Sequence, residues 1–309
     1  MDLALDVTIQ VIIIFLLMGI GFIFNKTGKL TSEGIKQITN ILLTIVTPCV
    51  LIDAYQKKVF NQQLLKELVF AAGLSLVVQL AAILIGKLIF KKDEQEHFRI
   101  NIFSTAYSNC GFMAIPLLSA TMGEDGVFYG SAYLAVFSVL SWTHGIYVIS
   151  GDRSEISAKN IIKNPGVMGT VIALLLFFLK INLPSVLSQT VSYVAGLNTP
   201  LAMFVLGTYL VGINLKKIFS NKQVYLCLFL RLIAVPLIAV IIAAFIKTNP
   251  LIVKSILIPA ACPVAAICTL FAAKYGKDAA YATEIVASST LVSIITIPVV
   301  IILASLTGI

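Results

Sequence analysis

Long apolar runs recur from one end of the chain to the other, and they constrain the fold more than any other feature. Runs of 18 residues or more are long enough to cross a hydrocarbon core of roughly 30 Å at 1.5 Å per residue. Of the 309 residues, 59% are hydrophobic and 12% are charged, whereas a soluble domain carries about 25% charged residues. Because no stretch is left for a soluble domain, the sequence predicts an all-α polytopic membrane protein.

The apolar runs predict ten membrane spans. They cover residues 7–24, 35–56, 64–90, 98–122, 126–150, 165–181, 185–213, 223–246, 252–275 and 279–306. The first run follows Asp2 and Asp6 rather than a basic segment, and no small-residue cleavage site follows it. We therefore expect a retained span there rather than a signal peptide.

Lysine and arginine indicate which side of the membrane each loop faces. With the N-terminus outside, fifteen of them lie in inner loops: Lys26, Lys29, Lys36, Lys87, Lys91, Lys92, Arg99, Arg153, Lys159, Lys163, Lys216, Lys217, Lys222, Lys274 and Lys277. Six lie in outer loops: Lys57, Lys58, Lys66, Lys180, Lys247 and Lys254. The positive-inside bias predicts a cell-membrane protein with both termini outside. The net charge of +8 does not indicate nucleic-acid binding, because these residues sit singly or in adjacent pairs between apolar runs.

Two of the predicted spans are interrupted where a membrane helix should be continuous. The first interruption is the segment 108–116, which contains Asn109, Gly111 and Pro116, and the second is 259–265, which contains Pro259 and Pro263. Proline and glycine free backbone groups that lipid cannot solvate, so such breaks persist where they line a protein cavity or a substrate. Paired breaks in corresponding spans are the sequence pointer to a transporter's binding site.

The two halves of the chain also share a weak repeat. Cys110 and Pro263 lie 153 residues apart, the Thr-Pro pairs at 47–48 and 199–200 lie 152 apart, and Gly123 and Gly276 lie 153 apart. Since each half would hold five spans, the second half must be inverted relative to the first. We therefore predict two inverted repeats, residues 1–150 and 166–309, joined by a short cytoplasmic connection at 151–165, with broken crossover helices as spans 4 and 9.

Each break would expose the amino end of a half-helix, whose amides favour an anion. The candidate substrate-binding residues are Asn109, Cys110, Gly111, Pro116, Cys262, Pro263, Val264 and Gln79. Alternatives stay open for three kinds of residue. Asn109 could cap the local backbone, the prolines could only kink their helices, and Gln79 could bond a neighbouring helix rather than face the cavity.

Arg231 and Glu284 are the two charged residues predicted to lie deep in the membrane. Arg231 lies roughly 13 Å into span 8 by helix rise, and Glu284 lies at a comparable depth in span 10. Charges at such depth are functional by default. A structural ion pair between the two is favoured, and a proton or anion relay is the alternative.

Catalytic and metal-binding patterns are missing from the sequence. We find no nucleophile–base pair, metal-ligand cluster or phosphate loop, and the five cysteines lie within apolar runs as small filler. The sequence therefore predicts a protein that is not an enzyme and has no cofactor. A channel is less favoured than a carrier, because polar residues are isolated instead of forming a continuous stripe.

The segment Asn109–Leu118, read as NCGFMAIPLL, resembles the fourth-span motif of the auxin efflux carrier family. Residues 260–263 and 271–275 resemble its ninth-span counterpart. This family includes plant PIN-type carriers and bacterial proteins of the malate-permease type, and the likeness covers essentially the whole chain. It implies an inverted five-plus-five fold shared with bile acid–sodium symporters.

The resemblance also implies a mechanism and partners. Spans 1, 2, 6 and 7 would form a scaffold through which a homodimer could assemble, and spans 3–5 and 8–10 would form a mobile transport domain. A small organic anion, a carboxylate such as malate or an auxin-like acid, would bind beside the crossover and move by an elevator-type shift. The short connection at 151–165 favours a compact bacterial-type member. Proton or sodium coupling stays open, and a cation-coupled symporter or a sodium–proton antiporter is the alternative.

Overall fold

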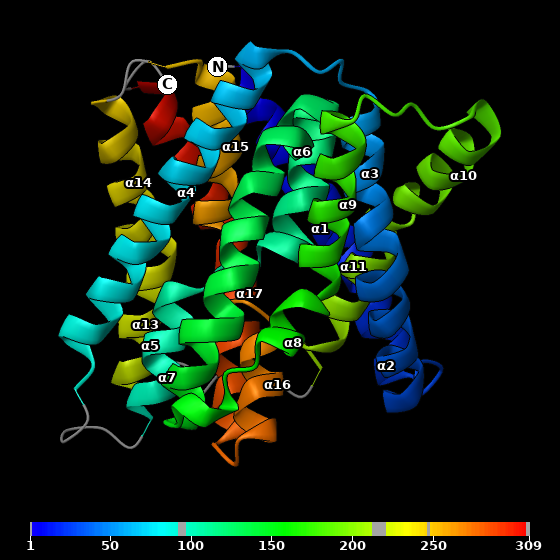
Figure 1. The fold of residues 1–309 in the computed structure, drawn as a ribbon. Coiled ribbons are helices and arrows are strands. Elements are labelled where there is room, and N and C mark those ends of the chain that lie inside the picture. The colour runs from blue at the N-terminus through cyan, green and yellow to red at the C-terminus, as the bar shows by residue number, and fades with distance from the viewer. Residues whose placement is uncertain (1, 92–96, 212–220, 246–247, 307–309) are drawn as a thin grey trace.

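A computed structural model describes residues 2–91, 97–211, 221–245 and 248–306. The described chain is a bundle of helices (Figure 1). The first half contains α1 (Asp2–Lys26), α2 (Ser32–Ile41), η1 (Leu42–Val46), α3 (Thr47–Gln56), α4 (Gln62–Ile89), α5 (Phe98–Ala106), η2 (Cys110–Ala114), α6 (Ile115–Leu140), η3 (Ser141–Gly145) and α7 (Ile146–Ser150). The second half contains η4 (Arg153–Glu155), α8 (Ala158–Ile162), α9 (Pro165–Phe178), α10 (Ser185–Gly196), α11 (Asn198–Thr208), α13 (Lys222–Phe229), η5 (Leu230–Ala234), α14 (Val235–Ala244), α15 (Pro250–Ala261), α16 (Ile267–Lys274) and α17 (Ala279–Leu306).

Seven helical stretches in the described ranges are long and apolar enough to cross a membrane. They are Leu5–Lys26, Ser32–Gln56, Gln62–Ile89, Cys110–Ser150, Ser185–Thr208, Lys222–Ala244 and Ala279–Leu306. Two shorter apolar helices, α9 and α15, accompany them. Large apolar side chains of α1 and α4 point away from the bundle, as lipid-facing residues do. The prediction of an all-helical polytopic protein agrees with this architecture.

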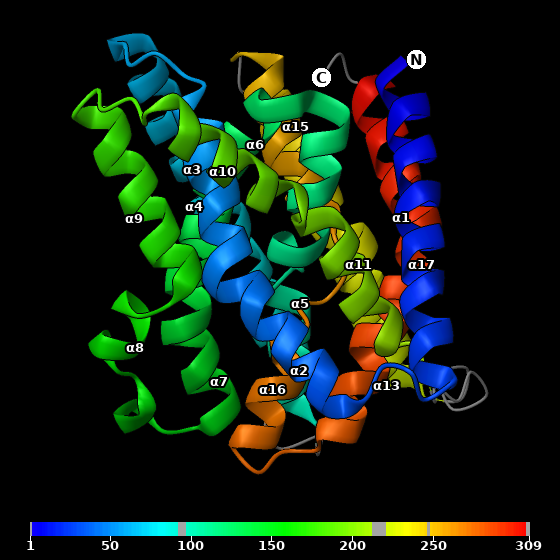
Figure 2. The same cartoon turned by 90° about the vertical axis from the view of Figure 1, so that its right-hand side faces the viewer.

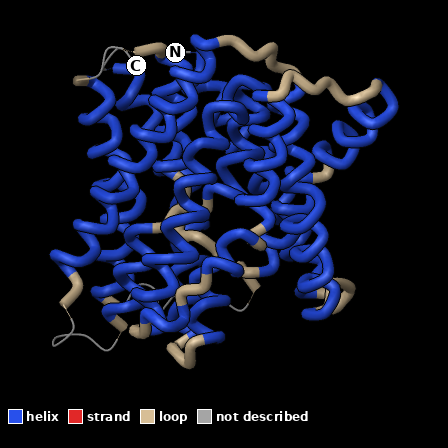
Figure 3. The backbone as a smooth tube through the Cα atoms, viewed as in Figure 1, coloured by secondary structure: helices blue, strands red, loops and turns tan. Residues whose placement is uncertain are grey.

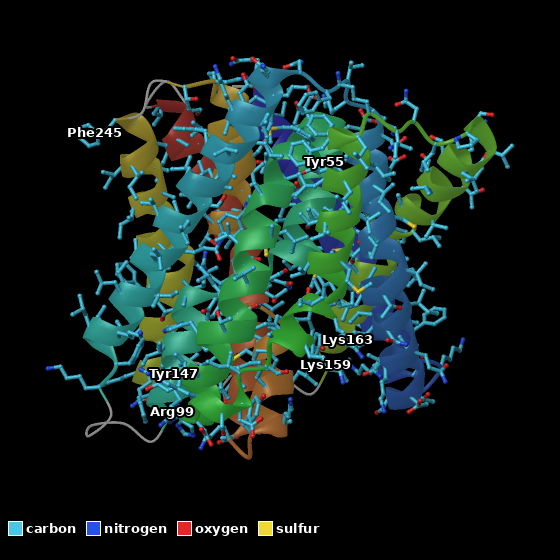
Figure 4. The ribbon with its side chains drawn as sticks, viewed as in Figure 1. Tyr55, Arg99, Tyr147, Lys159, Lys163 and Phe245 are labelled. Carbon is cyan, nitrogen blue, oxygen red and sulfur yellow. The ribbon has the colours of Figure 1, made fainter. Side chains whose placement is uncertain are left out.

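Both termini lie at the same end of the bundle, which we call the N/C end (Figures 1 and 2). Arg99, Lys159 and Lys163 lie toward the opposite end, whereas Tyr55 and Phe245 lie toward the N/C end (Figure 4). Four of the basic residues counted for the orientation, Lys92, Lys216, Lys217 and Lys247, lie outside the described residues. The arrangement is the one expected if the N/C end faces outward.

We divide the helices into two groups, which also contact each other extensively through α1 and α6. In one group α1 packs on α11, and α3 packs on α9 and α10. In the other α6 packs on α4 and α15, and α16 packs on α17. The groups meet where α6 contacts α3 and α9 and where α1 contacts α17.

Three prolines follow segments in which the helix widens to π geometry. The segments η1, η2 and η5 each end two residues before a proline: Pro48, Pro116 and Pro236. A proline lacks its own N–H and clashes with the carbonyl four residues earlier. In each segment the amide of the residue before the proline bonds the carbonyl five residues earlier, and the helix continues through the wider turn. Pro48 therefore modifies span 2 without interrupting it, as expected of a kink.

Gly123 joins the predicted spans 4 and 5 more tightly than expected. Instead of a loop over residues 123–125, α6 passes through one bend, at which Gly123 has φ 59° and ψ −149°. This conformation is essentially restricted to glycine, because a Cβ would clash with the backbone. A single residue therefore reverses the chain direction between the two halves of α6.

Candidate functional site

The two predicted breaks are present, and they lie against each other in the middle of the bundle. The loop segments there are visible among the helices in Figure 3. Ser108 and Val264 form an isolated antiparallel bridge. The Asn109 amide donates to the Pro263 carbonyl at 2.7 Å, and the Ala265 amide donates to the Tyr107 carbonyl at 2.9 Å. We call residues 107–109 and 262–266 the break pair.

Local chemistry explains why the chain breaks at these positions. Asn109 has φ −77° and ψ 56°, and the Cys110 amide bonds the Ser108 carbonyl at 2.8 Å, which is the geometry of an inverse γ-turn. Cys262 is extended, with φ −66° and ψ 153°. The residue before a proline is pushed out of the helical region, so Pro263 ends α15 there. Each break thus has a cause in its own sequence, and each satisfies backbone groups of the other.

The backbone of Asn109 makes hydrogen bonds at the break, whereas its side-chain Nδ2 donor makes none with the described residues. Its carbonyl accepts the amides of Met113 and Ala114, at 3.1 and 3.4 Å. Its side chain is 4% exposed, and the Nδ2 group has no partner among the described residues. A buried donor without an acceptor costs free energy. The side chain of Asn109 is therefore available for a ligand at the break pair.

Arg231 lies on η5 and is fully buried behind the break pair. Its Nη1 group donates to the carbonyls of Thr105 and Ala106, at 3.2 and 3.4 Å, and its Nη2 group donates to the carbonyl of Ala260. These carbonyls belong to the last turns of α5 and α15. The guanidinium thus binds both half-helices at their carboxyl ends.

The favoured ion pair between Arg231 and Glu284 is not formed. The described ion pairs involve Lys57, Lys58 and His97, and Arg231 is not among their members. Carbonyl groups at the ends of α5 and α15 accept from both Nη groups instead, while the Nε donor has no partner among the described residues. Glu284 lies on α17, and its buried Oε1 atom has no partner in the described part of the chain.

The other predicted site residues divide into two sets. Cys110, the first residue of η2, and Cys262, within the break pair, are both buried. Pro116 begins the run of α6 that follows η2. Gln79 instead donates to the Tyr133 carbonyl at 3.3 Å, which is the helix-to-helix alternative, although its Oε1 atom stays unpartnered within the described ranges.

Sequence reasoning missed two residues that hold the break pair. The Ser289 Oγ atom accepts the Val264 amide at 3.1 Å. The Tyr133 hydroxyl accepts from the Ser108 hydroxyl at 3.4 Å and interacts with Arg231. Serine and tyrosine are scattered along these spans, and no local pattern distinguishes the two that matter.

A cavity of about 260 Å³ lies between the two packing groups, with a lining from α3, α6, α10 and α11. It is lined by Val50, Asp53, Ala54, Lys57, Ile115, Ser119, Glu124, Val127, Ser192, Ala195, Gly196, Asn198 and Thr199. None of the predicted substrate-binding residues lines it. The cavity nevertheless reaches Ile115, which directly follows η2.

Ion pairs join the two packing groups beside this cavity. Lys57 bonds Asp53 at 3.0 Å and Glu124 at 2.8 Å, and Lys58 pairs with Asp125. Burial lowers the pKa of Lys57, but its hydrogen bonds to Glu124 and Asp53 outweigh burial and raise the pKa overall. The ammonium therefore stays charged at neutral pH and holds the end of α3 to the bend of α6.

Comparison with known proteins gives a family match over nearly the whole chain. A family described as membrane transport protein matches residues 6–161 and 153–301. No curated protein matches the chain in sequence. The family match confirms the resemblance to the auxin efflux carriers that the residues around Asn109 indicate.

Proposed function

The chain belongs to the membrane transport protein family of the auxin efflux carriers, and on that premise we propose that it is a secondary transporter of a small organic anion. The substrate is a carboxylate, and the break pair holds its charged end. No arrangement of nucleophile and base is needed for this activity.

One observation carries the proposal. The two breaks meet, and the side-chain amide of Asn109, at the first break, has an Nδ2 donor without a partner among the described residues. The helices η2 and α16 both begin beside the break pair, so two helix amino ends lie there, although the Cys110 and Cys268 amides already bond the Ser108 and Ala265 carbonyls. The partial positive charge of these amino ends favours a negatively charged group. The Nδ2 donor of Asn109 adds a neutral hydrogen bond. A carboxylate fits this set of donors better than a metal cation does.

The architecture proposed for transport has ten spans in two inverted repeats. The bend at Gly123 divides the 41-residue stretch Cys110–Ser150 into two candidate spans, and both broken elements occupy corresponding places in the two halves. The common end of the termini, with Arg99, Lys159 and Lys163 opposite to it, favours termini outside. The scaffold would be the group around α1, α3, α9 and α11.

Substrate would reach the break pair through the cavity between the packing groups.

The outward surface of the scaffold is apolar, and Val186, Leu187 and Tyr193 of α10 are all more than half exposed. That surface suits lipid or a second copy of the chain, so a homodimer through the scaffold remains part of the proposal.

Uptake into liposomes tests the substrate class. We expect purified protein to give saturable uptake and counterflow of labelled mono- or dicarboxylates. A derivative of the best substrate in which an uncharged amide replaces the carboxylate should not compete for uptake. It lacks the negative charge that the positive ends of the two half-helices attract. Flux that rises linearly with concentration would indicate a channel instead.

A cross-link tests elevator-type movement. Lys58→Cys with Asp125→Cys joins the end of α3 to the bend of α6, at a pair that contacts in this structure. We expect a short, reducible thiol cross-linker to lower uptake to background, because the transport domain could no longer slide past the scaffold. Reductant should restore uptake. The two single-cysteine variants, treated in the same way, show how much of the inhibition comes from reaction with the native cysteines.

A second pair gives the matched control within the proposed transport domain. His97→Cys with Asp278→Cys replaces a hydrogen-bonded pair at 3.2 Å, between the residue before α5 and the residue before α17. Cross-linking there should leave uptake intact, because both residues would move together. Equal inhibition by the two cross-links would contradict the elevator movement.

Proton-coupled transport or sodium–proton antiport is the second candidate function. The observation that favours it is the buried, unpartnered Oε1 atom of Glu284, since carboxyl groups inside membrane segments commonly mark ion or proton pathways. Proton flux recorded during the same uptake experiment, with and without sodium, separates these modes from uniport.

A further inference from the structure

Arg231 places a positive charge beside the break pair, where the last carbonyl groups of two helices favour a cation. The helices α5 and α15 both end there, at Ala106 and Ala261. The last carbonyls of a helix have no intrahelical donor and carry a partial negative charge of roughly −0.5 per helix end. Two such ends in a lipid-surrounded interior need a positive group, because water cannot solvate them.

The guanidinium matches this requirement in geometry. Its planar donors spread over two directions, so Nη1 reaches Thr105 and Ala106 of α5 while Nη2 reaches Ala260 of α15. One side chain thereby ties together two half-helices that lie about 150 residues apart in the sequence.

The charges match as well. Two helix ends of roughly −0.5 each balance one guanidinium of +1. No carboxylate lies within ion-pair distance of Arg231 in the described ranges. The positive charge is therefore offset by neutral groups, chiefly the carbonyls and also the Tyr133 hydroxyl, as the charge of a bound monovalent cation would be.

We infer that Arg231 is a permanent counter-charge that occupies the place where backbone carbonyls of a broken-helix transporter can coordinate an alkali-metal ion. The chain carries this cation in its own sequence, so transport needs no sodium or potassium ion at that place. The part of the inference that concerns uptake rests on the proposed function. The effect on folding is independent of any substrate.

Thermal unfolding of the purified, full-length chain tests the inference. Arg231→Ala leaves the three carbonyls without donors, and we expect the unfolding midpoint in N-methylglucamine chloride to fall by roughly 5–10 °C. Low-millimolar guanidinium should restore at least half of that loss with saturable dependence, and sodium should restore part of it. The wild-type midpoint should respond to neither cation.

Arg99→Ala is the matched control. Arg99 also donates to a carbonyl in the last turn of a helix, that of Val148 at 2.8 Å, but it lies at the bundle end and is only partly buried. Water can replace it there, so this variant should show no rescue by guanidinium. Identical responses of the two alanine variants would overturn the inference.

Uptake provides a second, separate readout. Wild-type uptake should be unchanged when N-methylglucamine replaces sodium and potassium, and an absolute requirement for either ion would overturn the inference. Should Arg231→Ala not fold, Arg231→Lys carries the test. It should keep cation-independent uptake with a lowered midpoint, because an ammonium group supplies the charge but not the spread of donors. Failure of uptake with every substrate would contradict the proposed function and leave the unfolding result standing.

Discussion

Asn109→Ala should lower the specificity of uptake, kcat/KM, about 10- to 100-fold without destabilising the protein. A hydrogen bond to a charged group contributes about 1.5–3 kcal/mol, and each 1.4 kcal/mol is a factor of ten. The Nδ2 donor that the substitution removes has no protein partner. Because the free protein loses no hydrogen bond from Nδ2, its free energy of unfolding should stay the same or rise by up to about 1 kcal/mol.

The sign of the stability change separates a ligand-binding role from a capping role. Ser289→Ala is the matched control, since it removes a polar side chain at the same break pair that does have a partner, the Val264 amide. It should lower the free energy of unfolding by about 1–3 kcal/mol, because that buried amide is left unsatisfied. A comparable loss of stability in Asn109→Ala, with normal uptake per folded molecule, would assign Asn109 to the backbone alone.

The breaks could be predicted from the sequence because their causes are local. Pro263 forces Cys262 into an extended conformation, and the residues around Asn109 form a turn of three residues. Each effect depends on neighbours in the chain, so residue type and spacing reveal it. The expected resemblance of the fourth span to the auxin efflux carriers rests on the same local segment.

The partners of these residues could not be predicted, because they come from distant parts of the chain. Ser289 lies 25 residues from the amide that it accepts, and Arg231 lies 125 and 126 residues from two of its carbonyls. The ion pair expected between Arg231 and Glu284 rested on opposite charges at similar depth. Complementary charge says nothing about backbone carbonyls, which exist at every residue and become available only where a helix ends.

Gly21→Ala and Gly207→Ala should each lower the free energy of unfolding by about 2–3 kcal/mol through overpacking. The helices α1 and α11 approach so closely that a Cβ on Gly21 would lie 2.2 Å from the Phe204 carbonyl oxygen. A Cβ on Gly207 would lie 2.0 Å from the Met18 carbonyl oxygen. Small residues allow such contacts between membrane helices, and a backbone atom cannot rotate away as a side chain can. Denaturant titration of the purified protein in detergent measures both losses.

Gly19→Ala provides the comparison on the same helix. A Cβ at Gly19 meets no atom within 4 Å, and alanine favours a helix over glycine by about 1 kcal/mol. That variant should be as stable as the wild type or slightly more stable. The double variant Gly21→Ala with Gly207→Ala should lose less than the sum of the single losses, because either methyl group already pushes the two helices apart. Equal stability of Gly19→Ala and Gly207→Ala would show that α1 and α11 do not pack this closely.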